Sequence, residues 1–157
     1  MAKEEKVCWY VTITRNGQWK KIRTRLDEKG VGYYIPATYK TMVFLHTTKQ
    51  NALSLVNSGE VKGRFLIDHQ THTLLEVPEK QMEDFIRILD LSPDAECLTS
   101  VPLAKGDRVK VVKGALSGVE GDIVEMPEGL YLVVSVCSIL SARVQIPRSY
   151  VVPVPAK

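Results

Sequence analysis

The side chains best suited to chemistry in this sequence are three histidines, three cysteines and scattered carboxylates. His69 and His72 have a spacing that could bind a metal ion, but no cysteine or carboxylate cluster accompanies them to complete a site. We therefore interpret them as part of an exposed polar turn. His46 stands alone in a predicted strand, and the chain contains no nucleophile elbow, phosphate-binding loop or dinucleotide fingerprint. The sequence predicts no catalytic residue, no metal and no cofactor.

The composition fits a globular protein of one ordinary domain or two small ones. The 157 residues are 45% hydrophobic and 25% charged, and no apolar run approaches the length of a membrane span. The net charge of +3 is too small to indicate a nucleic-acid-binding protein by itself, although it allows weak, salt-sensitive phosphate contacts. Cys8, Cys97 and Cys137 are odd in number and widely spaced, and no signal peptide is visible. We therefore expect no disulfides and a reducing, cytoplasmic location.

Alternating and helical hydrophobic patterns divide residues 1–92 into strands and helices. Strands are predicted at residues 6–14, 31–37, 41–48, 64–68 and 73–77, and helices at 17–29, 49–57 and 78–90. Asn16 is the expected N-cap of the first helix, and Gly30 is its expected stop. This order predicts an α+β domain with helices on one face of an antiparallel sheet, of the ferredoxin-like kind.

The remaining residues are predicted to form a linker and a second domain. Residues 93–102 contain prolines and polar residues and are the expected linker. From residue 103 to 157 only short strands are predicted, and about five of them in some 50 residues suit a small closed barrel. The stretch Leu103–Met126 shows strand alternation around Val109 and Val111 and glycines at 114, 118 and 121. Glycines so placed indicate positive φ angles or close approach of backbones.

The residues of this stretch resemble the KOW motif of the NusG family of transcription elongation factors. The likeness rests on Gly106-Asp107-Arg108-Val109, on Ile123-Val124 and on the three glycines between them. The family pattern implies an SH3-like barrel in which the motif positions are Gly106, Val109, Val111, Gly114, Gly118 and Gly121.

The N-terminal half also resembles the NusG N-terminal domain, in the same order along the chain. Trp9-Tyr10-Val11 is similar to its W-Y-x-V opening, and Gly30 followed by Tyr33-Tyr34-Ile35-Pro36 is similar to its G-x-x-x-(F/Y)-x-P passage. Met42-Val43-Phe44-Leu45 resembles the hydrophobic GYVFV strand, and the helix after Pro78 resembles the segment that closes the domain.

The resemblance implies a non-enzymatic regulator that binds the clamp helices of the RNA polymerase β′ subunit and promotes processive elongation, or antitermination, of particular operons. By position, the docking face would consist of Ile13, Tyr39, Met42, Phe44, Met82 and Phe85. Each of these residues could instead belong to the hydrophobic core. Contact with non-template DNA or nascent RNA is also implied.

Two departures from the family pattern are informative. Residues 39–42, Tyr-Lys-Thr-Met, stand where the family has the F-P-G-Y entry to the third strand. In the KOW loops, Leu116 and Leu140 stand at positions that are often phenylalanine in the family. These differences indicate a specialised paralogue, such as those that serve surface polysaccharide operons. They put in doubt the binding of Rho or a ribosomal protein by the KOW surface.

Two alternatives remain open. A ribosome-associated KOW protein that binds RNA would need a denser basic surface than a net charge of +3 suggests. An enzyme could also use a cleft between the two domains, since active sites assemble from residues that are distant in sequence.

Overall fold

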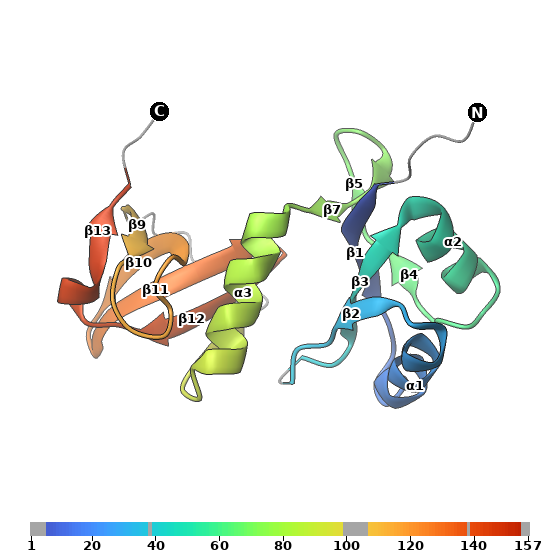
Figure 1. Cartoon of the computed structure of the whole chain (residues 1–157), viewed down its shortest axis with the longest axis horizontal. Helices are drawn as coiled ribbons and strands as arrows, with labels where there is room; N and C mark the ends of the chain where they lie inside the picture. The colour runs from blue at the N-terminus through green and yellow to red at the C-terminus, as the bar shows by residue number, and fades with distance from the viewer. Residues whose placement is uncertain (1–5, 38, 99–106, 138, 155–157) are drawn as a thin grey trace. The chain divides into compact units, whose positions relative to one another are not determined.

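The computed structural model describes residues 6–37, 39–98, 107–137 and 139–154 (Figure 1). The chain forms two compact units, Met1–Glu79 and Lys80–Lys157, and each is described by itself. Helices and antiparallel sheets occur together, which agrees with the predicted mixed α+β class. In the part of the chain that the structure describes, no helix is both long enough and apolar enough to cross a membrane.

The first unit is built on one antiparallel sheet. Its strands are β1 (Val7–Ile13), β2 (Gly32–Tyr34), β3 (Met42–Thr48), β4 (Arg64–Phe65) and β7 (Glu76–Val77). The order is β2-β3-β1-β4, and β7 also pairs with β1, so that β1 is the central strand. A separate two-stranded ladder joins β5 (Ile67–Asp68) to β6 (Thr73–Leu74). The two predicted strands at 64–68 and 73–77 are therefore each divided into two short pieces.

Helices α1 (Trp19–Lys29) and α2 (Lys49–Asn57) connect these strands. Gly30 ends α1 in the left-handed conformation, with φ of 69°, as the sequence predicts. The predicted N-cap at Asn16 is wrong, because α1 starts later, and Gln18 precedes it without a side-chain cap. At the start of α2, the hydroxyl of Thr48 accepts a hydrogen bond from the Asn51 N–H at 3.2 Å.

Strands β1 and β3 give the sheet two distinct faces, because side chains alternate along a strand. One face carries Cys8, Tyr10, Val43 and Leu45, and these pack with the apolar sides of α1 and α2 in one core. Figure 1 shows both helices on this side of the sheet. The opposite face carries Trp9, Val11, Ile13, Met42, Phe44 and His46, paired across the two strands. We call these six residues the Trp9 face.

Tyr10 makes the stability of the first unit sensitive to alkaline pH. Its side chain is 2% exposed, and burial, with smaller contributions from Cys8 and Glu76, raises the pKa of Tyr10 to about 12. In an unfolded chain the pKa of a tyrosine phenol is about 10, so the folded state holds this proton more tightly. The free energy of unfolding should therefore fall between about pH 10 and about pH 12, by roughly 3 kcal/mol in total. Urea midpoints measured across this range test the prediction.

A Tyr10→Phe variant is the control for this titration. It lacks the phenol and should lose less stability than the wild type over the same pH range. Burial also raises the pKa of the Cys8 thiol above its ordinary value, and this thiol adds a loss of the same sign in both proteins. An alkaline loss that is equal in the two proteins would contradict the assignment to Tyr10.

The second unit is organised around a six-stranded antiparallel sheet. Its strands are β8 (Glu96–Leu98), β9 (Arg108–Val111), β10 (Glu120–Met126), β11 (Gly129–Val136), β12 (Leu140–Gln145) and β13 (Val151–Pro153). The order is β13-β9-β10-β11-β12-β8, and a 3-10 turn at Arg148–Tyr150 precedes the last strand. Buried Val109, Val111, Ile123, Leu132 and Val134 contribute to its interior. Within the predicted linker 93–102, residues 96–98 form β8, which pairs with β12, and residues 99–102 lie outside the described residues.

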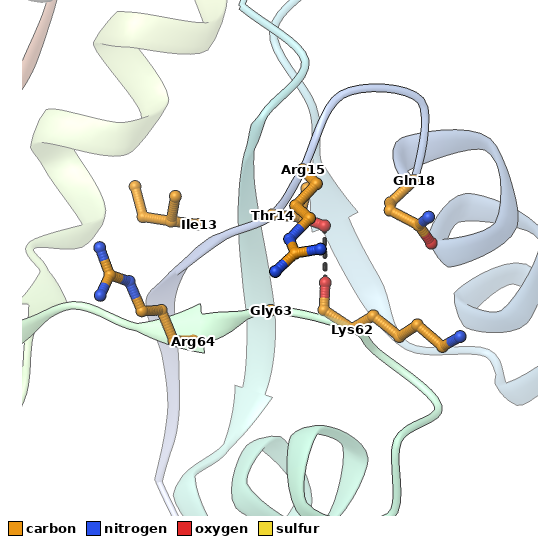
Figure 2. A pocket seen from close by; sticks show the side chains of 7 residues that line it. All are labelled: Ile13, Thr14, Arg15, Gln18, Lys62, Gly63 and Arg64. Atoms are coloured by element: carbon orange, nitrogen blue, oxygen red, sulfur yellow. Dashed lines mark hydrogen bonds between the residues drawn. The ribbon is translucent and has the colours of Figure 1, made fainter.

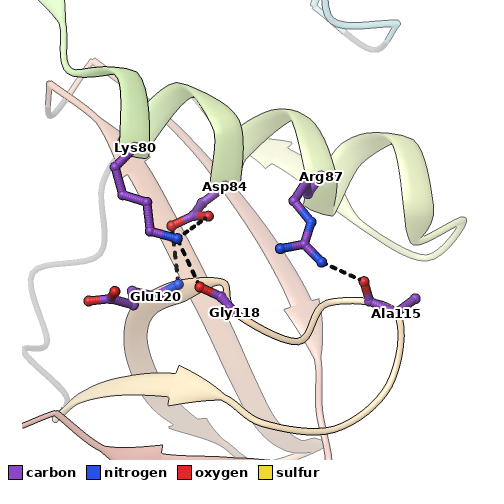
Figure 3. A network of polar contacts seen from close by, with 6 residues as sticks. All are labelled: Lys80, Asp84, Arg87, Ala115, Gly118 and Glu120. Atoms are coloured by element: carbon purple, nitrogen blue, oxygen red, sulfur yellow. Dashed lines mark hydrogen bonds and ion pairs between the residues drawn. The ribbon is translucent and has the colours of Figure 1, made fainter.

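Helix α3 (Glu79–Leu91) contacts the loop between β9 and β10, and the start of β10, through polar side chains (Figure 3). Lys80 Nζ donates to the Gly118 carbonyl at 2.8 Å, and Arg87 donates to the Ala115 carbonyl at 2.8 Å. Asp84 accepts from the Glu120 N–H at 3.2 Å and from Lys80 at 2.9 Å.

These contacts move the boundary between the units relative to the sequence-based prediction. The sequence analysis places this helix in the N-terminal domain and ends that domain at residue 92, whereas the contacts divide the chain after Glu79. The apolar spacing of Met82, Phe85 and Ile88 defines a buried helical stripe, and all three are fully buried. Periodicity identifies such a stripe correctly but does not specify which sheet receives the helix.

Candidate functional site

The Trp9 face carries three of the six residues that the resemblance assigns to polymerase docking. Ile13 lies opposite Met42 in the β1–β3 ladder, and Phe44 is the next same-face position after Met42. Phe44 is 0% exposed and Met42 is 4% exposed, whereas Ile13 is half-buried. Ile13 is therefore accessible to a partner, whereas Phe44 and Met42 expose almost no side-chain surface.

The other three predicted docking residues lie elsewhere. Tyr39 is half-buried in the turn before β3, where its carbonyl accepts the Met42 N–H at 3.4 Å. Met82 and Phe85 lie on α3, in the second unit, and are fully buried. Ile13, Tyr39, Met42 and Phe44 thus belong to the first unit, and the two helix residues belong to the second.

A polar cluster closes one end of the Trp9 face. The rings of Trp9 and His46 stack with centroids 4.3 Å apart and planes 10° from parallel. Glu79 binds both, since its carboxylate accepts from Trp9 Nε1 at 3.1 Å and lies 2.9 Å from His46 Nε2. Sequence reasoning gave His46 no role. The signal that could have found one is its strand register, which places it directly opposite Trp9.

A basic cavity of about 620 Å³ lies at the end of β1 (Figure 2). Arg15 and Gln18 line it after β1, and Lys62, Gly63 and Arg64 line it from the other side. The hydroxyl of Thr14 donates to the Lys62 carbonyl at 2.6 Å, and this hydrogen bond holds the two segments together. A side chain at Gly63 would collide, because its Cβ would lie 2.6 Å from the Ile13 carbonyl oxygen.

The cations of this cavity have no carboxylate partner at ion-pair distance among the described residues. The side chains of Arg15, Lys62 and Arg64 are all exposed. Three uncompensated cations around a concave surface favour a polyanionic ligand, for example a nucleic-acid backbone. Sequence reasoning missed this site because the Ile13–Arg64 pairing brings together residues about fifty positions apart.

Five of the six positions that the resemblance assigns to a KOW motif lie among the described residues of the C-terminal unit. Val109 and Val111 are buried on β9, while Gly114 and Gly118 have φ angles of 82° and 97°. Gly121 is needed for a different reason, since a Cβ there would lie 2.5 Å from the Val133 carbonyl oxygen of the neighbouring strand. The sixth motif position, Gly106, lies outside the described residues.

The two residues proposed as a KOW partner surface are buried. Leu116 is 8% exposed and Leu140 is 0% exposed, so neither offers a side-chain surface of useful size. Leu140 begins β12, where it is paired with Val136, which is also 0% exposed. A partner of this unit that binds the folded protein would have to contact other residues.

The described ranges contain no group of three or more histidine, cysteine or acidic side chains able to hold a metal ion. His72 adopts a positive φ of 58° in the loop between β5 and β6, and its N–H donates to the Asp68 carbonyl at 2.8 Å. The same aspartate side chain accepts from the Gln70 N–H at 2.8 Å, which is typical of an Asx turn. His69 and His72 are both exposed, and the geometry around them is that of a polar turn.

Comparisons with known proteins give little further information. No family model matches the chain, and no curated protein matches it. Among solved structures, it is similar to the crystal structure of the MjSpt4:Spt5 complex in conformation B, at 17% identity and a TM-score of 0.35, covering 94% of this chain and 97% of that one. Conformation A of the same complex gives 16% identity and a TM-score of 0.34, with coverage of 93% and 97%. Likeness at this level carries no weight for the fold or function of this chain.

Proposed function

We propose that this protein is a non-enzymatic transcription elongation and antitermination regulator that docks on the clamp helices of the RNA polymerase β′ subunit. The NusG-like motifs, which follow one another in the family's order, support this class of regulator. We propose further that the protein is cytoplasmic and serves particular operons, including surface polysaccharide operons. The observation that carries the docking proposal is the Trp9 face, in which Ile13, Met42 and Phe44 line the side of the sheet opposite α1 and α2. Methionine and aromatic side chains on one surface suit a helical partner.

Burial decides which residues make the first contact. Ile13 and Tyr39 are half-buried and therefore accessible, so we assign them the initial contact with the clamp helices. Phe44 and Met42 expose almost no surface, so we assign them the support of the docking surface from within the sheet and not the first contact.

Capture of core RNA polymerase on the full-length chain tests the proposal. Tyr39→Ala should weaken capture by about 30-fold, because truncation of a central aromatic anchor commonly costs about 2 kcal/mol or more. Lys49→Ala, an exposed change on α2 beyond the opposite face of the sheet, is the matched control and should bind as the wild type does. Equal capture by the wild type, Tyr39→Ala and Ile13→Ala would contradict this docking surface.

The basic cavity at Arg15, Lys62 and Arg64 supports an added contact with non-template DNA or nascent RNA. The same cavity is the observation that favours the second candidate, a ribosome-associated RNA-binding protein. The two functions differ in their dependence on polymerase. Sedimentation with ribosomes at moderate salt, without binding to polymerase, would favour the second candidate.

A further inference from the structure

We infer that the surface around Trp19 is a binding site for a nucleotide unit, with the base stacked on the indole and the phosphate held by the surrounding cations. The inference deepens the proposed function and rests on it for the source of the ligand, a single strand exposed during transcription. The site shares no residue with the Trp9 face or with the basic cavity at Arg15, although one lining residue of each cavity is adjacent in sequence.

Three cationic side chains gather on one indole ring. The charged groups of Lys40, Arg23 and Lys20 lie 4.4, 5.0 and 5.7 Å from the centroid of the Trp19 ring. Within the described residues none of the three has a carboxylate partner at ion-pair distance. Farther along the same helix, in contrast, Arg25 and Lys29 pair with Glu28 and Glu60. Positive charge is therefore left uncompensated at the Trp19 end of α1, where an anion would be attracted.

The ring also borders a cavity of a size that suits a small ligand. The cavity has a volume of about 370 Å³, and Trp19, Arg23, Tyr33, Tyr34 and Lys40 contribute to its walls. Known ligand sites span roughly 300–1,000 Å³ and combine apolar or aromatic walls with a few charged groups. The Tyr33 hydroxyl donates to Asp27 at 2.8 Å, which fixes one aromatic wall and engages the carboxylate on that side.

The combination of a flat aromatic ring with several cations selects the ligand class. A nucleotide presents a planar π-system and an anionic phosphate a few ångströms apart, so one unit satisfies both features of the site. The long Lys40 side chain leaves the ring face when a base stacks there and then pairs with the phosphate. An acidic peptide would satisfy the cations but would leave the indole without a stacking partner.

The neighbouring basic cavity favours a strand over a free nucleotide. Gln18 lines the basic cavity and the next residue, Trp19, lines the aromatic one, so the two sites meet at consecutive residues. A single strand could place its phosphates along Arg15 and Lys62 and one base on Trp19. This is the usual arrangement of stacking platforms within a positively charged groove.

The test measures tryptophan fluorescence and anisotropy of the full chain with AMP, with a labelled dT oligonucleotide of about 12 nucleotides, and with an acidic peptide, at low salt. Trp19 is one of only two tryptophans, and it is half-buried whereas Trp9 is buried, so a base stacked on Trp19 should quench its fluorescence. Trp19→Ala should bind the oligonucleotide about five- to 150-fold more weakly, and Trp19→Phe should recover part of the affinity. Lys40→Ala should reduce the salt dependence of binding by about one phosphate contact.

Lys29→Ala is the matched control, because it removes one positive charge from the last residue of α1, about 15 Å along the helix from Trp19. It should leave the oligonucleotide affinity close to that of the wild type. Quenching by AMP alone would assign the site to a free nucleotide, and stronger binding of the oligonucleotide would assign it to a strand. Both results support a nucleotide site.

Three results would overturn the inference: no quenching by AMP or the oligonucleotide, unchanged affinity in a folded Trp19→Ala variant, or Trp19-dependent binding of the acidic peptide alone. Polymerase capture by Trp19→Ala separates this inference from the proposed function. A folded variant that loses oligonucleotide binding and retains capture supports both. Capture that fails in the wild type removes the proposed function, while the fluorescence result still decides the nucleotide site.

Discussion

Phe44→Ala should lower the free energy of unfolding of the first unit by about 3–5 kcal/mol, the usual result of truncating a buried phenylalanine. Phe44 is 0% exposed, and its strand β3 lies between β1 and β2, where no edge is available for relaxation. It is paired directly opposite Val11, which is also fully buried. The truncated side chain would leave a cavity lined by groups that lose their packing partners.

Urea denaturation of the full chain, monitored by circular dichroism, measures this loss. The chain has two units, so the curves should be fitted without assuming a single transition. Tyr39→Ala is the matched aromatic truncation, and it should cost much less because Tyr39 is only half-buried. An unchanged midpoint for Phe44→Ala, together with weakened polymerase capture, would mean that Phe44 is a docking residue that the fold does not need.

Gly121→Ala should destabilise the second unit by about 3 kcal/mol, the upper part of the range for overpacking. An added Cβ would lie 2.5 Å from the Val133 carbonyl oxygen, 3.0 Å from Val134 Cγ2 and 3.1 Å from Leu132 Cδ1. The first of these atoms belongs to the backbone of β11, which pairs with β10 at this point. The methyl group can be accommodated only if the two strands separate.

Gly118→Ala is the comparison for this prediction. Its φ of 97° imposes backbone strain of about 1–2 kcal/mol on any other residue, but the nearest atom, on Arg87, would be 3.4 Å from the new Cβ. Gly121→Ala should therefore be the more damaging change in a thermal melt. A larger loss for Gly118→Ala would contradict the close approach of β10 and β11.

The sequence predicted the local structure well where one pattern determines it. The strand at Val7–Ile13, the helix at Lys49–Asn57 and the stop at Gly30 follow from alternation, helical spacing and the positive φ that glycine allows. The glycine geometry at positions 114, 118 and 121 also agrees with the expected tight, closely packed hairpins.

Features that depend on long-range packing were not predictable in this way. The apolar stripe of α3 can be recognised from the spacing of its hydrophobic residues. Its polar side chains, however, bind the carbonyls of Ala115 and Gly118, which lie in the loop between β9 and β10 and come near the helix only in the folded chain. The same applies to the basic cavity, which depends on β4 pairing with the end of β1. It applies also to Glu79, which binds two rings more than thirty positions away.

Polymerase docking is the central claim, and a comparison of two polymerases tests it most directly. The full-length chain is titrated against core RNA polymerase with intact β′ clamp helices and against core enzyme in which the tips of those helices are deleted. The proposal predicts saturable binding to the intact enzyme and a loss of at least about 30-fold for the deleted one, since the anchors Ile13 and Tyr39 would have no partner. Equal binding to both enzymes, or no binding to either, would contradict it.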